Sequence, residues 1–176
     1  SAAFYGLAGD FVRLVAPHTE SDPAALLIQL LVSFGNVIGR SAHWRVVATK
    51  HYLNLFAVLV GSTAKGRKGT SLDMVLELFG RVDPDWLVSC VKSGLSTGEG
   101  LKFHVRDAVE KNEEITDGGI TDKRLLTVES EFANILNVCK REGNTLSTTI
   151  RQSWDTGNLR NLTKNDPTTA TGAHIS

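Results

Sequence analysis

Apolar residues recur along this chain with two different spacings, and the two spacings predict different elements. Steps of three and four residues place side chains on one face of a helix, whereas short continuous or alternating apolar runs are typical of strands. Helices are expected at Phe4–Val15, Pro23–Ile38, Thr70–Phe79, Phe132–Cys139 and Asn144–Trp154, with a further short helix that carries Val105 and Val109. Strands are expected at His43–Thr49, Tyr52–Val60, Trp86–Val91 and Leu125–Val128, and another begins at His174–Ser176.

The order of these elements predicts an α/β fold, because strands that alternate with helices form a mostly parallel sheet. The run Tyr52–Val60 is almost uninterrupted, which favours a central strand covered on both faces. Residues 1–42 are interpreted as a helical preface and residues 43–176 as the core, within one globular unit. The polar segment Lys111–Asp122 is expected to be an exposed, mobile loop, and Asn158–Thr171 is expected to be a loop.

Candidate chemistry begins where the run Tyr52–Val60 ends in a glycine. Small and cationic residues follow, and then a Thr-Ser pair opens an amphipathic segment. A strand, a glycine-rich loop and a helix in this order are typical of a phosphate site, because backbone N–H groups and the helix N-terminus converge on the anion. The expected phosphate loop consists of Gly61, Ser62, Thr63, Ala64, Lys65, Gly66, Arg67, Lys68, Gly69, Thr70 and Ser71.

The loop departs from the common pattern G-x-x-x-x-G-K-[ST] at one place. Gly61 and Gly66 have the usual spacing, but Arg67 stands where the lysine is expected. We interpret the loop as one residue longer, with Lys68 as the phosphate-binding lysine and Thr70 as the hydroxyl that binds magnesium. The alternative is a strand-to-helix turn that binds nothing.

Three acidic residues are candidates for the rest of such a site. Glu129 follows an apolar strand and is expected to hold magnesium through a water molecule, unless that strand simply ends in solvent. Glu99, which lies between two glycines and is expected to point freely into a cleft, and Glu131 are the candidates to activate water. Ligands bind at the carboxyl ends of parallel strands, so the turns at Gly61, Gly98 and Glu129 are expected to converge.

Composition narrows the classes of partner. Lysines plus arginines and acidic residues both number 19, so the formal net charge is zero and any site for a polyanion must be a local patch. The apolar runs are too short to span a bilayer, and the two cysteines lie far apart without a metal-binding motif. We therefore expect a cytoplasmic protein with no membrane partner. For Arg106, Arg124 and Arg151, presentation to a neighbouring subunit's nucleotide and an ordinary ion pair both remain open.

Several segments resemble a family of phage, plasmid and bacterial P-loop ATPases described as primase-helicase-like or replication-associated. The segments that carry the resemblance are Asn54–Ser71, Ser93–Leu101, Leu125–Phe132, Lys140–Asp155, Phe4–His18 and Thr171–Ser176. The resemblance implies a RecA-like core that binds ATP and Mg²⁺, with Lys68 and Thr70 in the phosphate loop. It favours Glu99 as the activating glutamate. Glu129 takes the place of the family's second, acidic motif. That motif ends in Asp-Glu in many relatives, whereas the corresponding residues here are Glu-Ser-Glu. It also implies a further strand beyond Ser176, so the core is expected to be incomplete at its C-terminal end.

The resemblance implies an ATPase that acts on single-stranded DNA as a homo-oligomer, with a hexameric ring in the full-length protein. A nucleotide- or DNA-binding module without turnover is the main alternative, which the unusual acidic motif favours. A small-molecule phosphotransferase ranks last, because no arginine cluster suggests a lid over the phosphates.

Overall fold

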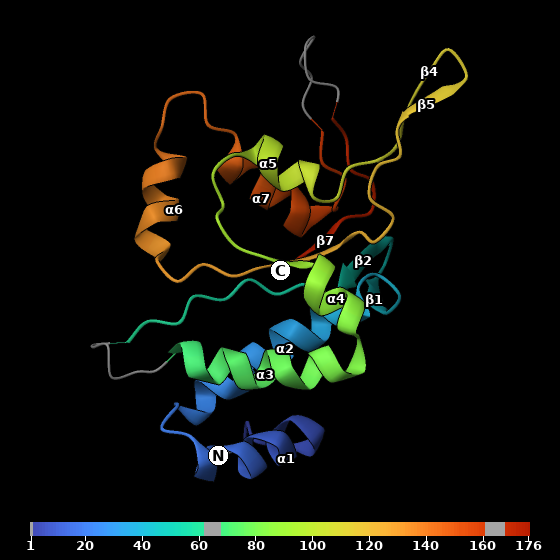
Figure 1. The fold of residues 1–176 in the computed structure, drawn as a ribbon. Helices are drawn as coiled ribbons and strands as arrows, with labels where there is room; N and C mark the ends of the chain where they lie inside the picture. The colour runs from blue at the N-terminus through green and yellow to red at the C-terminus, as the bar shows by residue number, and fades with distance from the viewer. Residues whose placement is uncertain (1, 62–67, 161–167) are drawn as a thin grey trace.

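Figure 1 shows the fold as a computed structural model, which describes residues 2–61, 68–160 and 168–176. The helices are α1 (Gly6–Val15), the 3₁₀ turn η1 (Ala16–His18), α2 (Pro23–Ile38), α3 (Lys68–Val82), α4 (Pro84–Ser89), α5 (Gly98–Phe103), α6 (Phe132–Cys139) and α7 (Leu146–Asp155). The strands are β1 (His43–Val46), β2 (Thr49–Tyr52), β3 (Val91–Lys92), β4 (Val109–Lys111), β5 (Glu114–Asp117), β6 (Arg124–Thr127) and β7 (His174–Ile175).

A three-stranded parallel sheet joins segments that are far apart in the chain. Its strand order is β3-β6-β7, with Val91 paired to Leu126 and Arg124 paired to His174. The ladder includes N–H···O bonds of 2.8 Å from Leu126 to Cys90 and 3.0 Å from Ser176 to Leu125. The expected α/β class with a parallel sheet is therefore confirmed.

Helices cover both faces of this sheet (Figure 1). Leu125 and Leu126 are successive residues of β6, so their side chains point to opposite faces, and both are buried. Leu126 packs in a cluster with α2, α3 and α4, whereas Leu125 packs in a second cluster with α5 and α7. Two small cores, one on each face, result from this alternation.

The helix α2 begins and ends at the predicted residues. Asp22 caps it by accepting a 2.7 Å hydrogen bond from the N–H of Ala24, and Pro23 occupies the first helical position. Gly39 ends it with a φ of 65°, which a residue with a side chain rarely adopts. Among the described residues, no helix has both the length and the apolar character needed to cross a bilayer.

The predicted central strand Tyr52–Val60 is wrong. Strand β2 ends at Tyr52, and residues 53–61 form no ladder with any described strand. Val60 is 90% exposed, although its β-branched side chain favours a strand. The segment instead lines a cavity, to which β7 also contributes.

The predicted strand Trp86–Val91 is also wrong over most of its length. Asp83 caps helix α4 by accepting a 2.9 Å bond from the N–H of Trp86, and Pro84 follows as the first helical residue. Trp86 and Cys90, one helical turn apart, are both buried. A strand begins only at Val91.

Two predicted segments are antiparallel hairpins outside the parallel sheet. The predicted strand His43–Thr49 contains β1 and the first residue of its partner β2. Lys111–Asp122 contains β5, which pairs with β4 rather than forming a loop. Val109, predicted to lie in a helix, starts β4. Within the expected loop Asn158–Thr171, Leu159 and Ala170 are buried and form an isolated antiparallel bridge.

The side-chain amide of Asn36 links α2 to α4 and to two strands. Its nitrogen donates to the carbonyl oxygens of Leu125 (3.0 Å) and His174 (3.3 Å), and its oxygen accepts a 2.8 Å bond from the indole N–H of Trp86. The residue is completely buried, and its oxygen is the acceptor that satisfies the buried indole N–H of Trp86.

Asn36→Ala should therefore lower the free energy of unfolding by about 2–4 kcal/mol, because it leaves a buried indole N–H without an acceptor. Urea denaturation measures this change. Asn137→Ala, at an exposed position on α6, is the control and should change the stability by less than about 0.5 kcal/mol. An equal effect of the two substitutions would contradict the linking role of Asn36.

His174 makes stability depend on pH. Burial, followed by the positive charges of Arg40 and Arg124, lowers its pKa to about 4. The unfolded chain, with a pKa near 6.5, takes up a proton that the folded chain excludes as the pH falls from 6.5 to 4. The stability present above pH 6.5 should decrease over this window by about 3 kcal/mol.

In the His174→Leu variant, the free energy of unfolding should depend less on pH across this window, because leucine takes up no proton in the unfolded chain. Denaturation at several pH values measures this dependence. His104→Gln removes an exposed histidine and should retain the full dependence. If both variants retain it, His174 is not the responsible group.

Candidate nucleotide-binding site

The two flanks of the expected phosphate loop are described, and its middle is not. An extended segment leads to Gly61, and α3 begins at Lys68. Residues 62–67, which include the expected loop residues from Ser62 to Arg67, lie outside the described residues, and for Lys68 and Gly69 only the backbone is described. The flanks thus have the order extended segment, loop and helix.

Helix α3 suits an anion at its N-terminus. It is 15 residues long and has no acidic residue in its first turn, so nothing on it offsets the positive end of the helix dipole. Thr70, in this first turn, is exposed, whereas Ser71 is buried. Of these two residues, Thr70 is therefore the one whose hydroxyl is accessible to a ligand.

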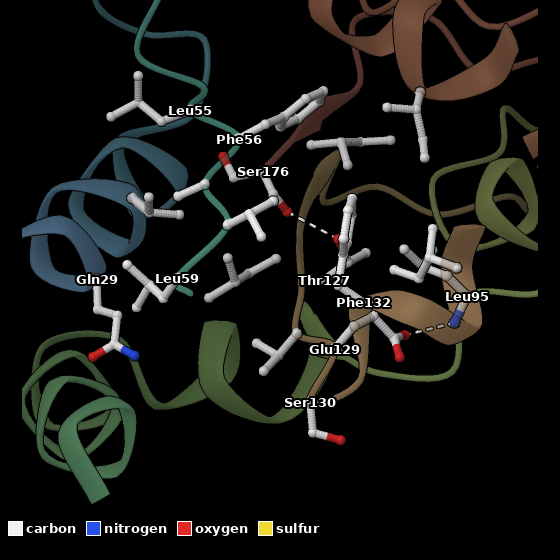
Figure 2. Close-up of a pocket in the computed structure, with 18 of the residues that line it drawn as sticks. Gln29, Leu55, Phe56, Leu59, Leu95, Thr127, Glu129, Ser130, Phe132 and Ser176 are labelled. Carbon is white, nitrogen blue, oxygen red and sulfur yellow. Dashed lines mark hydrogen bonds between the residues drawn. The ribbon is translucent and has the colours of Figure 1, made fainter. Parts of the chain in front are cut away.

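Glu129 lies just beyond the carboxyl end of β6 and contacts the turn that follows the adjacent strand β3. Its Oε1 accepts hydrogen bonds from the N–H groups of Gly94 (2.5 Å) and Leu95 (2.6 Å), the second of which Figure 2 shows. Charge-assisted bonds of this kind are stronger than neutral ones and orient the carboxylate. Glu129 thus contacts the segment that leads from β3 to Gly98, which is the first residue of α5.

A cavity of about 940 Å³ extends from this turn to the flanks of the loop (Figure 2). Leu59 before the loop, Leu72 in α3, and Glu129 with Ser130 after β6 all line it. Its remaining wall is mostly apolar and comes from residues 55–58 and from α2, β6, α6, α7 and β7. A phosphate chain needs converging donors, and Arg151 is the cationic side chain among the polar groups that line this cavity with Glu129 and Ser130.

Glu99 and Glu131 lie elsewhere and are held by other groups. The hydroxyl of Thr145, at the start of α7, donates a 2.8 Å bond to Oε1 of Glu99. Glu131, at the N-cap of α6, accepts a 2.8 Å bond from the side-chain amide of Asn134. Neither glutamate lines the cavity. The expectation that Glu99 points freely into a cleft is wrong, because its carboxylate faces α7.

The three arginines considered for a neighbouring nucleotide have different surroundings. Arg106 forms a 2.6 Å ion pair with Asp117, and Arg124 is bound by Asp83 and Asp122. These carboxylates raise the pKa of both guanidinium groups and hold them in the structure. Arg151 lines the cavity and donates only a 3.2 Å bond to Ser147, so it is the one of the three that can approach a ligand there.

The two expected magnesium ligands line different pockets: Glu129 lines the cavity described above, whereas Thr70 lines a smaller one with residues 17–20. Hydroxyl and carboxylate oxygens, such as those of Thr70 and Glu129, are the ligands Mg²⁺ prefers beside phosphates and water. Among the described residues, no group of three or more histidine, cysteine, aspartate or glutamate side chains forms a complete metal site. Oε2 of Glu129 accepts no hydrogen bond from any described residue, which leaves it available for a metal-bound water.

Sequence reasoning missed the cluster around Arg124. Asp122 lies two residues before this arginine, whereas Asp83 and Cys90 cap the two ends of α4, and no motif links the two segments. Burial, followed by Asp122, raises the pKa of the Cys90 thiol to about 12, so this cysteine is an inert core residue.

Glu129→Ala should expose the turn after β3. We expect hydrogen exchange at the amides of Gly94 and Leu95 to accelerate about tenfold, since each loses an acceptor worth about 1–2 kcal/mol. Glu129→Gln keeps an acceptor and should have a smaller effect. Glu142→Ala, at an exposed position, is the control. Unchanged exchange in Glu129→Ala would show that the turn is held by other contacts.

Comparison with known proteins yields no family model, no curated protein and no solved structure that matches this chain.

Proposed function

We propose that this chain is the nucleotide-binding core of a RecA-like P-loop ATPase that binds ATP with Mg²⁺ and acts on single-stranded DNA as an oligomer. The observation that carries the proposal is the shared cavity: Leu59 and Leu72, which flank the loop, line it together with Glu129 at the carboxyl end of β6. Ligands of parallel sheets bind at this end of the strands.

Each residue then has a chemical role. The backbone between Gly61 and Thr70 and the N-terminus of α3 receive the phosphates, and the ammonium group of Lys68 binds the outer ones. Thr70 and Glu129, the latter through water, would hold the metal ion. Magnesium supplies charge neutralisation on the phosphate oxygens when bound.

A binding module without turnover is the second candidate, and a specific observation favours it. Both carboxylates considered for water activation, Glu99 and Glu131, accept hydrogen bonds from neighbouring side chains and do not line the cavity. Hydrolysis would require Glu99 to leave Thr145, or another group to orient water. Nucleotide binding alone requires neither.

Lys68→Ala should weaken binding of a fluorescent ATP analogue at least about tenfold in the presence of Mg²⁺, because it removes a charge-assisted contact to the outer phosphates. Equilibrium titration measures the affinity, and far-ultraviolet circular dichroism checks the fold. Lys140→Ala removes one exposed cation elsewhere and is the control.

Equal affinities of Lys68→Ala and the unsubstituted chain would refute the phosphate role of Lys68. Phosphate release, measured in the same samples with and without single-stranded DNA, separates the two candidates. Release stimulated by DNA and lost in Lys68→Ala supports the ATPase. Nucleotide binding without release supports the module.

A further inference from the structure

Positive charge is concentrated in one part of this neutral chain. No aspartate or glutamate occurs between Asp22 and Asp73. The lysines and arginines of that stretch are Arg40, Arg45, Lys50, Lys65, Arg67 and Lys68. The stretch contains the hairpin β1–β2, which therefore carries cations and no acid. Such local patches are the electrostatic footprint of a polyanion partner.

The hairpin exposes aromatic rings together with these cations. All residues of β1 and β2 are exposed except Tyr52, which is half-buried, and the Trp44 side chain is 75% exposed. Register pairs His43 with Tyr52 and Arg45 with Lys50, and these four residues share one face of the ribbon. Trp44 lies on the opposite face, so both faces offer a ring.

The paired cations lack the acidic partners that bind Arg106 and Arg124. Arg45 and Lys50 lie directly opposite each other, which destabilises a hairpin through like-charge repulsion. Within the described ranges neither forms an ion pair, and Arg45 donates only to the carbonyl of Val47 at 2.9 Å. Arg106 and Arg124, by contrast, are bound by aspartates. An anion placed between Arg45 and Lys50 would relieve the repulsion.

Aromatic side chains beside the cations extend the same face. The rings of His43 and Tyr52 lie 5.5 Å apart, and the guanidinium carbon of Arg40 lies 4.1 Å from the centre of the Tyr52 ring. Surfaces that combine cations for the phosphates with rings on which bases stack bind single strands, whose bases are unpaired and accessible. A duplex hides the faces of its bases and cannot use these rings.

We propose that the β1–β2 hairpin is the single-stranded nucleic acid contact of this protein, with Arg45 and Lys50 on phosphates and the neighbouring rings on bases. The assignment rests on the proposed function for its partner class and gives that partner a defined surface. In Figure 1, residues 53–61 begin at the hairpin and lead away from it toward the side of the molecule where α3 begins. The two sites can therefore be tested separately.

Arg45→Gln/Lys50→Gln should weaken binding of a labelled oligodeoxythymidine of about 20 nucleotides at least about tenfold, measured by fluorescence anisotropy. The slope of log affinity against log salt should become shallower by about 1.4, since two phosphate contacts are lost. Lys140→Gln/Arg141→Gln removes the same charge from exposed positions near α6 and should leave affinity within about twofold. A duplex of equal length should bind more weakly, and oligouridine distinguishes RNA from DNA.

Equal affinity of the hairpin variant and the unsubstituted chain, an equal loss in the control variant, or absent oligonucleotide binding would overturn the proposal. Duplex binding as tight as single-strand binding would overturn the assignment to single strands. Lys68→Ala should keep oligonucleotide affinity, and the hairpin variant should keep affinity for the ATP analogue. Failure of the hairpin site is therefore distinguishable from failure of the nucleotide site.

Discussion

The buried amide of Asn36 is the interaction on which the arrangement of the central elements depends. Apolar packing alone allows a helix to slide over a sheet, because dispersion and burial are non-directional. The three hydrogen bonds of Asn36 fix α2 relative to Trp86, β6 and β7 at once. A shift of α2 would leave buried donors and acceptors without partners, which costs more than a small change in packing.

The parallel pairing of β3 with β6 brings the end of β6 beside the turn after β3. Glu129 then receives two backbone N–H groups, although 34 residues separate it from Leu95 along the chain. Its carboxylate both holds that turn and stands at the polar end of the cavity shared with the flanks of the loop. One side chain thus connects the parallel sheet to the candidate chemistry, while Glu99 is bound by Thr145 and Glu131 by Asn134.

Cations serve two different purposes in this molecule. Arg106, Lys123 and Arg124 form ion pairs with aspartates and hold loops against the sheet. Arg45 and Lys50 face each other on an exposed ribbon instead. Over the whole chain the 19 lysines and arginines are balanced by 19 acidic residues. The composition therefore gave no indication of a polyanion partner. Only strand register showed that two cations share one face.

Local patterns determined the elements whose signals are contained within a few residues. The bounds of α2 follow from Asp22, Pro23 and Gly39, and α6 and β6 follow from their apolar spacing. Strand partners were decided only by tertiary structure, because a ladder needs a second edge that sequence spacing does not specify. Residues 53–61 are apolar enough for a strand but meet a cavity instead of an edge. For the same reason, the motif placed Glu129 at a strand end, whereas only the packing of α7 revealed that Thr145 holds Glu99.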